Sequence, residues 1–393
     1  MSNATTRRLG AVLREGEEVT PLELFFDLVF VLALTQCTAL MAATPTWEGL
    51  ARGLLVLAVL WWAWVGYAWL TSVVDPEEGA VRIAMFAAMA AFLVAALAVP
   101  GAFDDDALLF AGAYGIVRAG QIALFLLASR DDPSLRHSVW GLAGSTAIGV
   151  ALIASASLVD GVAQGALWAF ALLLDMGGPY LFGAEGWVLS PRHFAERHGL
   201  IVIIALGESI VAIGVGSEAG LDAGVVAAAT LGIGVAAALW WLYFDVVARV
   251  ATRRLVAVRD RRERNEMARD SYSFLHFPMV AGIVLSAVGL KKTLEHVDEP
   301  LDTVPAVALL GGVVAYLLAH VAFRWRNVHT LSRTRVVASL VTVALFPLAL
   351  EIAALATLAL VFAVLAALVA YEALRFAEAR DRVRHELAHG EAP

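Results

Sequence analysis

Two acidic side chains lie one turn apart inside an apolar stretch near the start of the chain. Glu23 and Asp27 belong to "VTPLELFFDLVFVLALTQ", residues 19–36, which is otherwise typical of a membrane-spanning helix. A carboxylate within a span is costly unless it faces a partner or a water-filled cavity, and such acids often bind ions or carry protons. The pair therefore raises the question of whether this segment moves charge.

Glu23 has a structural explanation, whereas Asp27 does not. The order Thr20-Pro21-Leu22-Glu23 is a capping box, with Thr20 as the N-cap and Glu23 reaching back to its amide. Asp27 lies deeper, about 10 Å from the start of the helix at 1.5 Å per residue. We therefore expect Asp27 to need a partner of opposite charge.

The sequence offers Arg197 as that partner. The segment "SPRHFAERHGLIVIIALGES", residues 190–209, aligns with the opening stretch if two residues are inserted, and this places Arg197 at the position of Asp27. The pair could lock two halves together or take part in transport, and both readings stay open. Glu208 lies further along the same helical face, as either a hydrogen-bonded structural acid or a titrating, ion-contacting group.

A second group of candidates surrounds Arg118, which lies in the middle of a span. Tyr114, Arg118 and Gln121 share one helical face. A buried arginine requires a counter-charge. The acids available within spans are Asp27, Asp175 and Glu208.

Three further residues are weaker candidates for an ion or proton pathway. Asp175 precedes Gly177, Gly178 and Pro179, which permit a broken helix. His276 could carry a proton or make an interhelical hydrogen bond. His320 occupies the position that Arg118 holds in the first half.

No constellation for metal or cofactor chemistry emerges. "HELAH" at 385–389 fits the H-E-x-x-H pattern of zinc proteases, but no sequence follows that could supply a third ligand. Cys37 is the only cysteine, and Lys291 and Lys292 are the only lysines, at a helix end. We expect neither cofactor nor metal, and an enzyme is the less favoured class because no nucleophile–base pair is evident.

Composition places the chain in a membrane. Of its residues 60% are hydrophobic and 16% are charged, whereas soluble proteins carry about 25% charged residues. Twelve stretches are long and apolar enough to span a bilayer. They lie near 20–42, 49–73, 80–99, 106–128, 137–158, 162–183, 193–216, 222–247, 271–291, 303–323, 334–350 and 353–374.

Most of the 28 Lys and Arg residues fall on one side of these spans. The positive-inside rule therefore predicts that both termini are cytoplasmic, and we expect no cleaved signal peptide because the N-terminal stretch lacks its apolar segment. The arginine-rich connection 249–269 is expected to contact anionic lipid headgroups rather than nucleic acid.

The two halves of the chain are similar. "LWWAW" at 60–64 matches "LWWLY" at 239–243, and Tyr114 and Arg118 match Tyr316 and His320 at one constant offset. We predict an all-α polytopic protein with two parallel six-helix repeats, related by an axis along the membrane normal. The expected parts are a tail at 1–19, repeats at 20–183 and 184–376, and a charged tail at 377–393.

"LELFFDLVFVLALTQ" and "HFAERHGLIVIIALGESIVAIG" resemble the two signature stretches of the bacterial low temperature requirement protein A family. The resemblance runs from Thr20 to about Arg375. It implies a multi-pass membrane protein, and it marks as motif residues Glu23, Asp27, His193, Glu196, Arg197 and Glu208. It implies no particular substrate.

The sequence thus favours a transporter or ion-conducting permease, with a charged pathway between the halves that could couple to protons. The alternative is a membrane-embedded binding or assembly protein whose buried charges are structural. A small ion or solute is the expected partner besides the bilayer, and the sequence predicts no oligomeric state.

Overall fold

The computed structural model describes residues 14, 17–77, 79–181, 187–217 and 220–375. In this part of the chain all elements are helical, apart from one isolated bridge between Pro300 and Ala353. The all-α prediction is confirmed. Two compact units can be distinguished: Met1–Ile204 with Val258–Phe277 forms unit 1, and Ala205–Ala257 with Pro278–Pro393 forms unit 2. These units are defined by contacts, so they do not test the expected duplication, which stays a prediction.

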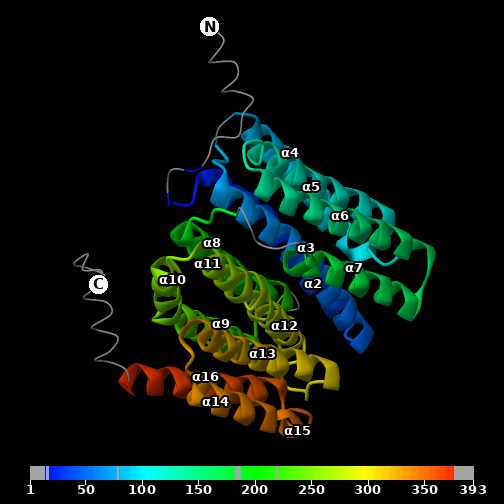
Figure 1. The fold of residues 1–393 in the computed structure, drawn as a ribbon. Coiled ribbons are helices and arrows are strands. Elements are labelled where there is room, and N and C mark those ends of the chain that lie inside the picture. The colour runs from blue at the N-terminus through cyan, green and yellow to red at the C-terminus, as the bar shows by residue number, and fades with distance from the viewer. Residues whose placement is uncertain (1–13, 15–16, 78, 182–186, 218–219, 376–393) are drawn as a thin grey trace. The chain divides into compact units, whose positions relative to one another are not determined.

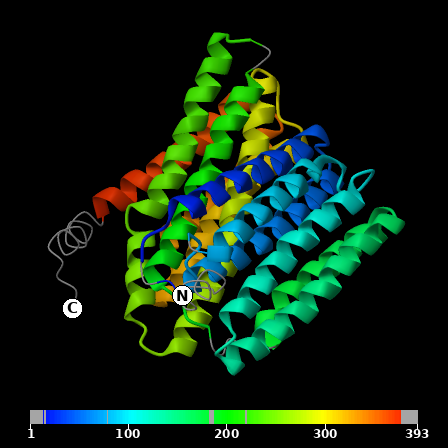
Figure 2. The same cartoon turned by 90° about the horizontal axis from the view of Figure 1, so that it is seen from above.

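Unit 1 is built around α3, which packs against α2, α5 and α7. Helices α4, α5, α6 and α7 lie side by side in both views (Figures 1 and 2). The bounds are α2 (Pro21–Ala43), α3 (Trp47–Val73), α4 (Gly79–Leu97), η1 (Val99–Gly101), α5 (Ala107–Ala128), α6 (Pro133–Ser155), η2 (Ala156–Leu158), α7 (Gly161–Leu181), α11 (Arg261–Met267) and the π-helical η3 (Ala268–Phe274). The first part of α8 (Pro191–Gly216) belongs to the same unit.

Unit 2 packs α9 against α16, and α14 against both α13 and α16. Its bounds are α9 (Ala223–Phe244), α10 (Val247–Ala257), α12 (His276–Glu295), α13 (Thr303–Val328), α14 (Arg333–Ala344), α15 (Phe346–Ala349) and α16 (Ala354–Arg375). Backbones approach closely where α12 meets α13, because a Cβ at Gly282 would lie 2.6 Å from the carbonyl oxygen of Gly312. Small residues at such a crossing are typical of membrane helices.

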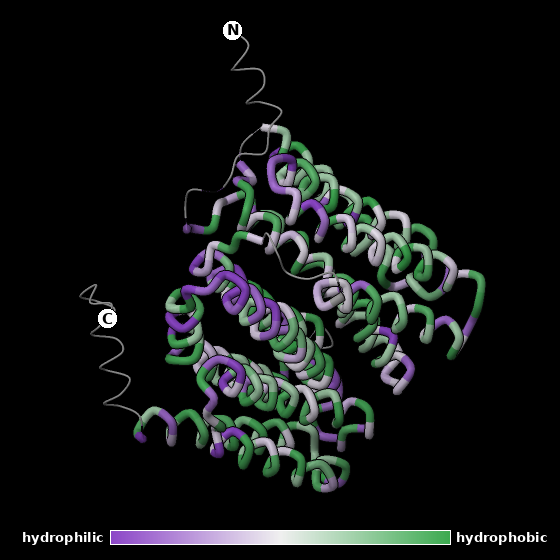
Figure 3. The backbone as a smooth tube through the Cα atoms, viewed as in Figure 1, coloured by the Kyte–Doolittle hydropathy of each residue, from purple (hydrophilic) through white to green (hydrophobic). Residues whose placement is uncertain are grey.

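Within the described residues, eleven helical segments are long and apolar enough to cross a membrane. They correspond to all of the expected spans except 334–350, which forms the separate helices α14 and α15. Pro347, in the first turn of α15, has no N–H to continue the hydrogen-bond ladder of α14. Hydrophilic residues gather over α11 (Figure 3), as its sequence RRERNEM requires.

Polar caps fix where several helices begin. Thr46 caps α3, Asp222 caps α9 and Asp132 caps α6. Because the carboxylate of Asp132 accepts hydrogen bonds from the N–H of Leu135 and from Ser134, its pKa is held below the ordinary value for aspartate. The expected break in α7 is absent, since this helix continues through Pro179 to Leu181.

Candidate functional site

The capping box expected at the start of α2 is present. Thr20 Oγ1 accepts from the N–H of Glu23 at 3.4 Å, and Glu23 Oε2 accepts from the N–H of Thr20 at 2.9 Å. Pro21 occupies the first helical turn.

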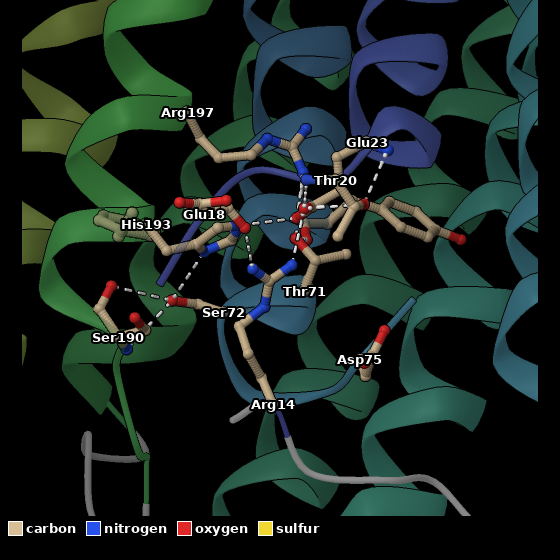
Figure 4. Close-up of polar contacts among 12 residues, drawn as sticks. Arg14, Glu18, Thr20, Glu23, Thr71, Ser72, Asp75, Ser190, His193 and Arg197 are labelled. Atoms are coloured by element: carbon tan, nitrogen blue, oxygen red, sulfur yellow. Dashed lines mark hydrogen bonds and ion pairs between the residues drawn. The ribbon is translucent and has the colours of Figure 1, made fainter. Parts of the chain in front are cut away.

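Glu23 is also the centre of a buried charge cluster (Figure 4). Its Oε2 accepts from Arg14 Nη2 at 2.7 Å. Its Oε1 lies 2.8 Å from His193 Nε2 and accepts from Arg197 Nη1 at 3.1 Å. Both carboxylate oxygens are therefore occupied, by groups from the N-terminal stretch, α2 and α8.

Asp27 forms the ion pair that the alignment predicts. Arg197 Nη2 donates to Asp27 Oδ1 at 2.5 Å, and Trp64 Nε1 from α3 donates to the same oxygen at 2.8 Å. Arg197 Nη1 also donates to Thr71 Oγ1 at 3.0 Å. Arg197 thus bridges two carboxylates, Glu23 and Asp27, and none of the three side chains is exposed.

The hydrogen bonding of this pair is incomplete. Among the described residues, Asp27 Oδ2 and Arg197 Nε are buried and have no hydrogen-bond partner. Such atoms are rare because each carries an uncompensated desolvation cost. The two acids that lie one turn apart on α2 therefore differ in their hydrogen bonding. Both oxygens of Glu23 have partners, whereas one oxygen of Asp27 has none among the described residues.

The sequence did not predict an aromatic cluster that lies next to this pair. His198 follows Arg197 and packs against Trp64, His276 and Tyr272, with ring centroids 5.1, 5.2 and 5.4 Å away. The Nδ1 of His198 lies 2.8 Å from the carbonyl of Phe194, so it carries the proton and leaves Nε2 as a buried acceptor.

His276 makes a local hydrogen bond. Its Nδ1 donates to the carbonyl oxygen of Ser271 at 3.0 Å, within the π-helical turn that precedes α12. Trp61 Nε1 donates to the carbonyl of Ser273 in the same turn at 2.9 Å. Single π-helical turns are frequent at functional sites.

Arg118 finds its counter-charge in Asp175, not in Asp27. Arg118 Nη2 donates to Asp175 Oδ1 at 2.8 Å, and Thr146 Oγ1 donates to that oxygen at 2.6 Å. Tyr114 donates to the other carboxylate oxygen at 3.2 Å, and Gln121 Oε1 accepts from Arg118 at 2.7 Å. This buried network joins α5, α6 and α7.

A small cavity of about 70 Å³ in unit 1 reaches Arg118. Trp62, Gln121 and Phe125 line it, together with the Gly178-Pro179 end of α7. Gly178 allows α7 to approach α6, since a Cβ there would lie 2.9 Å from Ser145 Oγ. Gly178 and Pro179 therefore line a cavity within a continuous helix, and the helix break that the sequence permits at Gly177-Gly178-Pro179 does not occur.

In unit 2, His320 belongs to an ion-pair network that the sequence analysis missed. Arg335 Nη1 lies 2.6 Å from His320 Nδ1. Arg335 also pairs with Glu372, with Nη2–Oε2 at 2.9 Å and Nε–Oε1 at 3.1 Å. A guanidinium can only donate, so His320 Nδ1 accepts and is unprotonated in this arrangement.

Two further motif residues lie on α8. Glu208 is buried on α8, about three turns beyond Arg197. Glu196 is exposed on the same helix. The HELAH segment at 385–389 lies outside the described residues. Within them, no group of three or more His, Cys, Asp or Glu side chains could hold a metal ion.

Comparison with known proteins finds similarity over most of the chain. A family model described as bacterial low temperature requirement A protein (LtrA) matches residues 18–370. An uncharacterized protein of Rhizobium meliloti (strain 1021) is 31% identical over 307 residues, which is 75% of this chain and 74% of that protein. No solved structure matches significantly.

Proposed function

This chain belongs to the bacterial low temperature requirement A family, and on that premise we propose that it is a permease for a small ion or solute, with a protonatable site at Asp27. It is a multi-pass membrane protein, with eleven candidate spans in its described residues. Ionisable groups buried in such proteins usually serve ion or proton pathways.

The observation that carries this proposal is the unequal bonding of the two acids on α2. Glu23 has both oxygens occupied, as a structural clamp should. Asp27 is equally buried but keeps Oδ2 without a hydrogen-bond partner among the described residues. An unsatisfied oxygen at this depth costs stability, and a proton or a cation that binds there would compensate for it.

Arg197 can be held at this site in two ways, by both carboxylates or by Glu23 alone. It contacts Glu23 through Nη1 and Asp27 through Nη2. Protonation of Asp27 would cancel one of these ion pairs and leave Arg197 held by Glu23 and Thr71. A switch of this kind needs one group that changes charge and one element that responds to it.

His198 extends the same site beyond the ion pair. Its ring lies edge-on to Trp64, which itself donates to Asp27. The buried acceptor Nε2 of His198 offers a second place for a proton, and Trp64 contacts both this ring and the Asp27 carboxylate. We therefore propose protons as the coupling ion.

The internal arrangement of the two units supports the proposed duplication. In unit 1, Arg118 of α5 pairs with Asp175 of α7 beside Thr146 of α6. In unit 2, α13, α14 and α16 are joined through Arg335 and Glu372 beside His320. If α5–α7 correspond to α13–α16, each half has one buried arginine–carboxylate pair that ties its last three helices.

The proposal places the protein in the bacterial plasma membrane with both termini in the cytoplasm, as the distribution of arginines predicts. Within the segment 249–269, the short helix α10 turns Ala251 and Leu255 inward, whereas Arg249 and Arg254 are exposed. This amphipathic pattern suits contact with anionic lipid headgroups.

A membrane-embedded assembly protein is the second candidate, and the saturated cluster at Glu23 favours it. Closed ion pairs around Arg14, His193 and Arg197 are what a purely structural lock would contain. The two candidate functions predict different results when a mutation removes one charge and a second mutation restores the charge balance. A lock works again once its charges balance, whereas a transport site stays inactive without its carboxylate.

The test is flux of protons and small ions into proteoliposomes that contain the purified full chain. The decisive variant combines Asp27→Asn with Arg197→Gln, because this pair of changes removes one charge of each sign. Wild-type flux that is lost in the stable double variant supports the permease. Full flux in the double variant, or no flux of any tested ion or solute in wild type, contradicts it.

A matched control is available on the next helix of the chain. Glu48→Gln with Arg52→Gln removes a partly exposed i,i+4 ion pair on α3, with 2.8 Å between the charged atoms. Exposed pairs contribute only about 0–1 kcal/mol. The control should therefore keep both wild-type stability and wild-type flux.

A further inference from the structure

We propose that a cavity in unit 2 is a binding site for a small zwitterion, a molecule that carries an ammonium group and an anionic group. The inference deepens the permease proposal by naming a substrate class. It rests on that proposal for the transport step, whereas binding itself is argued from the cavity alone.

The cavity is large enough for a metabolite. Its volume is about 390 Å³, and it lies between the ends of α9, α13 and α14, with α10 and α16. Trp241 and Phe323 form part of an apolar wall, and polar groups interrupt that wall at few points. Ligand sites of about 300–1,000 Å³ with mainly apolar walls and a few placed polar groups are typical of small-molecule recognition.

Asn327 supplies an acceptor that lacks a donor. Its Nδ2 donates to the carbonyl oxygen of Phe323 at 2.7 Å, and this contact fixes the orientation of the amide because a carbonyl oxygen can only accept. Asn327 is 2% exposed and lines the cavity, and its Oδ1 has no hydrogen-bond partner among the described residues. A ligand in the cavity therefore needs an N–H or O–H directed at Oδ1.

The charged residues around the cavity favour a ligand that carries both a positive and a negative charge. The negative charge of Glu372 is balanced by the bidentate contact with Arg335. Asp245 and Arg324 are half-buried and also line the cavity. Thr330 takes only one of the five guanidinium donors of Arg324, at Nε and 2.9 Å.

A zwitterion fits this distribution better than an ion of single charge. Its ammonium group would donate to Asn327 Oδ1, and its anionic group would accept from Arg324, since both side chains line the cavity. A purely anionic ligand would leave Asn327 unsatisfied, and a purely cationic one would leave Arg324 without a counter-charge.

The cavity of unit 1 shows what distinguishes this site. Both cavities lie beside corresponding tryptophans, Trp62 and Trp241. At the offset that matches Tyr114 with Tyr316, Phe125 corresponds to Asn327, and each lines its own cavity. Unit 1 thus has an apolar ring where unit 2 has the unpartnered amide, and its cavity is about 70 Å³ instead of 390 Å³.

Two sources could supply this chemistry: a free amino acid, or the headgroup of an ethanolamine phospholipid. The experiment separates them with the full chain in nanodiscs of phosphatidylcholine alone. Isothermal titration calorimetry is run with a pool of the twenty protein amino acids, then with each singly, and separately with glycerophosphoethanolamine. Saturable heat from the amino acids identifies a solute site, and saturable heat from glycerophosphoethanolamine identifies a lipid headgroup site.

Variants of one residue tie the heat to the cavity. Asn327→Leu removes the acceptor at similar volume, and Asn327→Phe introduces the residue of unit 1. Each should weaken binding about tenfold or more, because a hydrogen bond to a charged group is lost. Asn327→Asp keeps an acceptor and should retain binding, while Trp325→Phe changes an exposed side chain of the same helix and should have no effect.

Absence of saturable heat from both probes in wild type overturns the proposal, as does equal affinity in wild type, Asn327→Leu and Asn327→Phe. The permease fails differently. Zwitterion binding without any flux would leave this site standing and refute transport. Flux of an ion without zwitterion binding would support the permease and refute this binding site.

Discussion

Asp27 and Arg197 offer the sharpest energetic prediction, because both are buried and, among the described residues, only Arg197 has a second charged partner, Glu23. The cluster contains Arg14, Arg197, Glu23 and Asp27, so its formal charges balance with His193 neutral. Asp27→Asn leaves one uncompensated positive charge inside the protein. Asn still provides an oxygen for Trp64 and Arg197, so packing and shape are almost unchanged.

Removal of one partner of a buried ion pair costs about 3–5 kcal/mol of stability. We expect Asp27→Asn to fall near the lower limit, about 3 kcal/mol, because Glu23 still contacts Arg197. Arg197→Gln should cost more, since it leaves Asp27 without a cation and Glu23 with Arg14 alone. The double variant restores the balance of charge and should be less destabilised than the sum of the two single variants.

The assay is the unfolding free energy of the full chain, from reversible sodium dodecyl sulfate titration in mixed micelles. The two single variants and the double variant form a cycle that isolates their interaction. We expect a coupling energy of about 2–3 kcal/mol, the upper part of the range for residues in one network. A coupling energy below about 0.5 kcal/mol would mean that the two charges do not depend on each other, and would refute the reasoning.

Three further changes test separate parts of the fold. Gly282→Ala places a Cβ 2.6 Å from the carbonyl oxygen of Gly312, and thermal unfolding should show a loss of about 1–3 kcal/mol; an unchanged melting temperature would mean that the α12–α13 contact is looser. Thr20→Ala removes the cap of α2 and should cost about 1 kcal/mol in the same assay; no loss would show that the cap is dispensable. Arg118→Gln and Asp175→Asn should each cost about 3–5 kcal/mol, and the double variant clearly less than their sum; additive losses would contradict a direct pair.

Sequence patterns were sufficient to predict the start of α2 and the partner of its deeper acid. The order Thr-Pro-Leu-Glu specifies a cap through contacts within four residues, which is why Thr20 and Glu23 were predicted correctly. The Asp27–Arg197 pair is a long-range contact, yet the internal alignment pointed to it. That success does not establish the duplication, because a buried acid and a buried arginine pair for electrostatic reasons in any arrangement.

Other members of the site depend on tertiary structure that the sequence does not encode locally. Arg335 lies close to an expected span end, where an arginine usually marks topology, and only the fold brings it to Glu372 and His320. Glu372 did carry a signal, as an acid within the expected span 353–374. His198 acquires its surroundings from the π-helical turn before His276, a backbone feature without a reliable sequence pattern.

The central claim is that Asp27 carries charge across the membrane, and solid-supported membrane electrophysiology tests it most directly. Proteoliposomes that contain wild type or the double variant Asp27→Asn, Arg197→Gln receive a step in pH. We expect a transient current in wild type that is absent from the double variant, although the purified double variant is folded and is reconstituted at the same protein content. Equal currents from the two proteins, or no current from wild type, would contradict it.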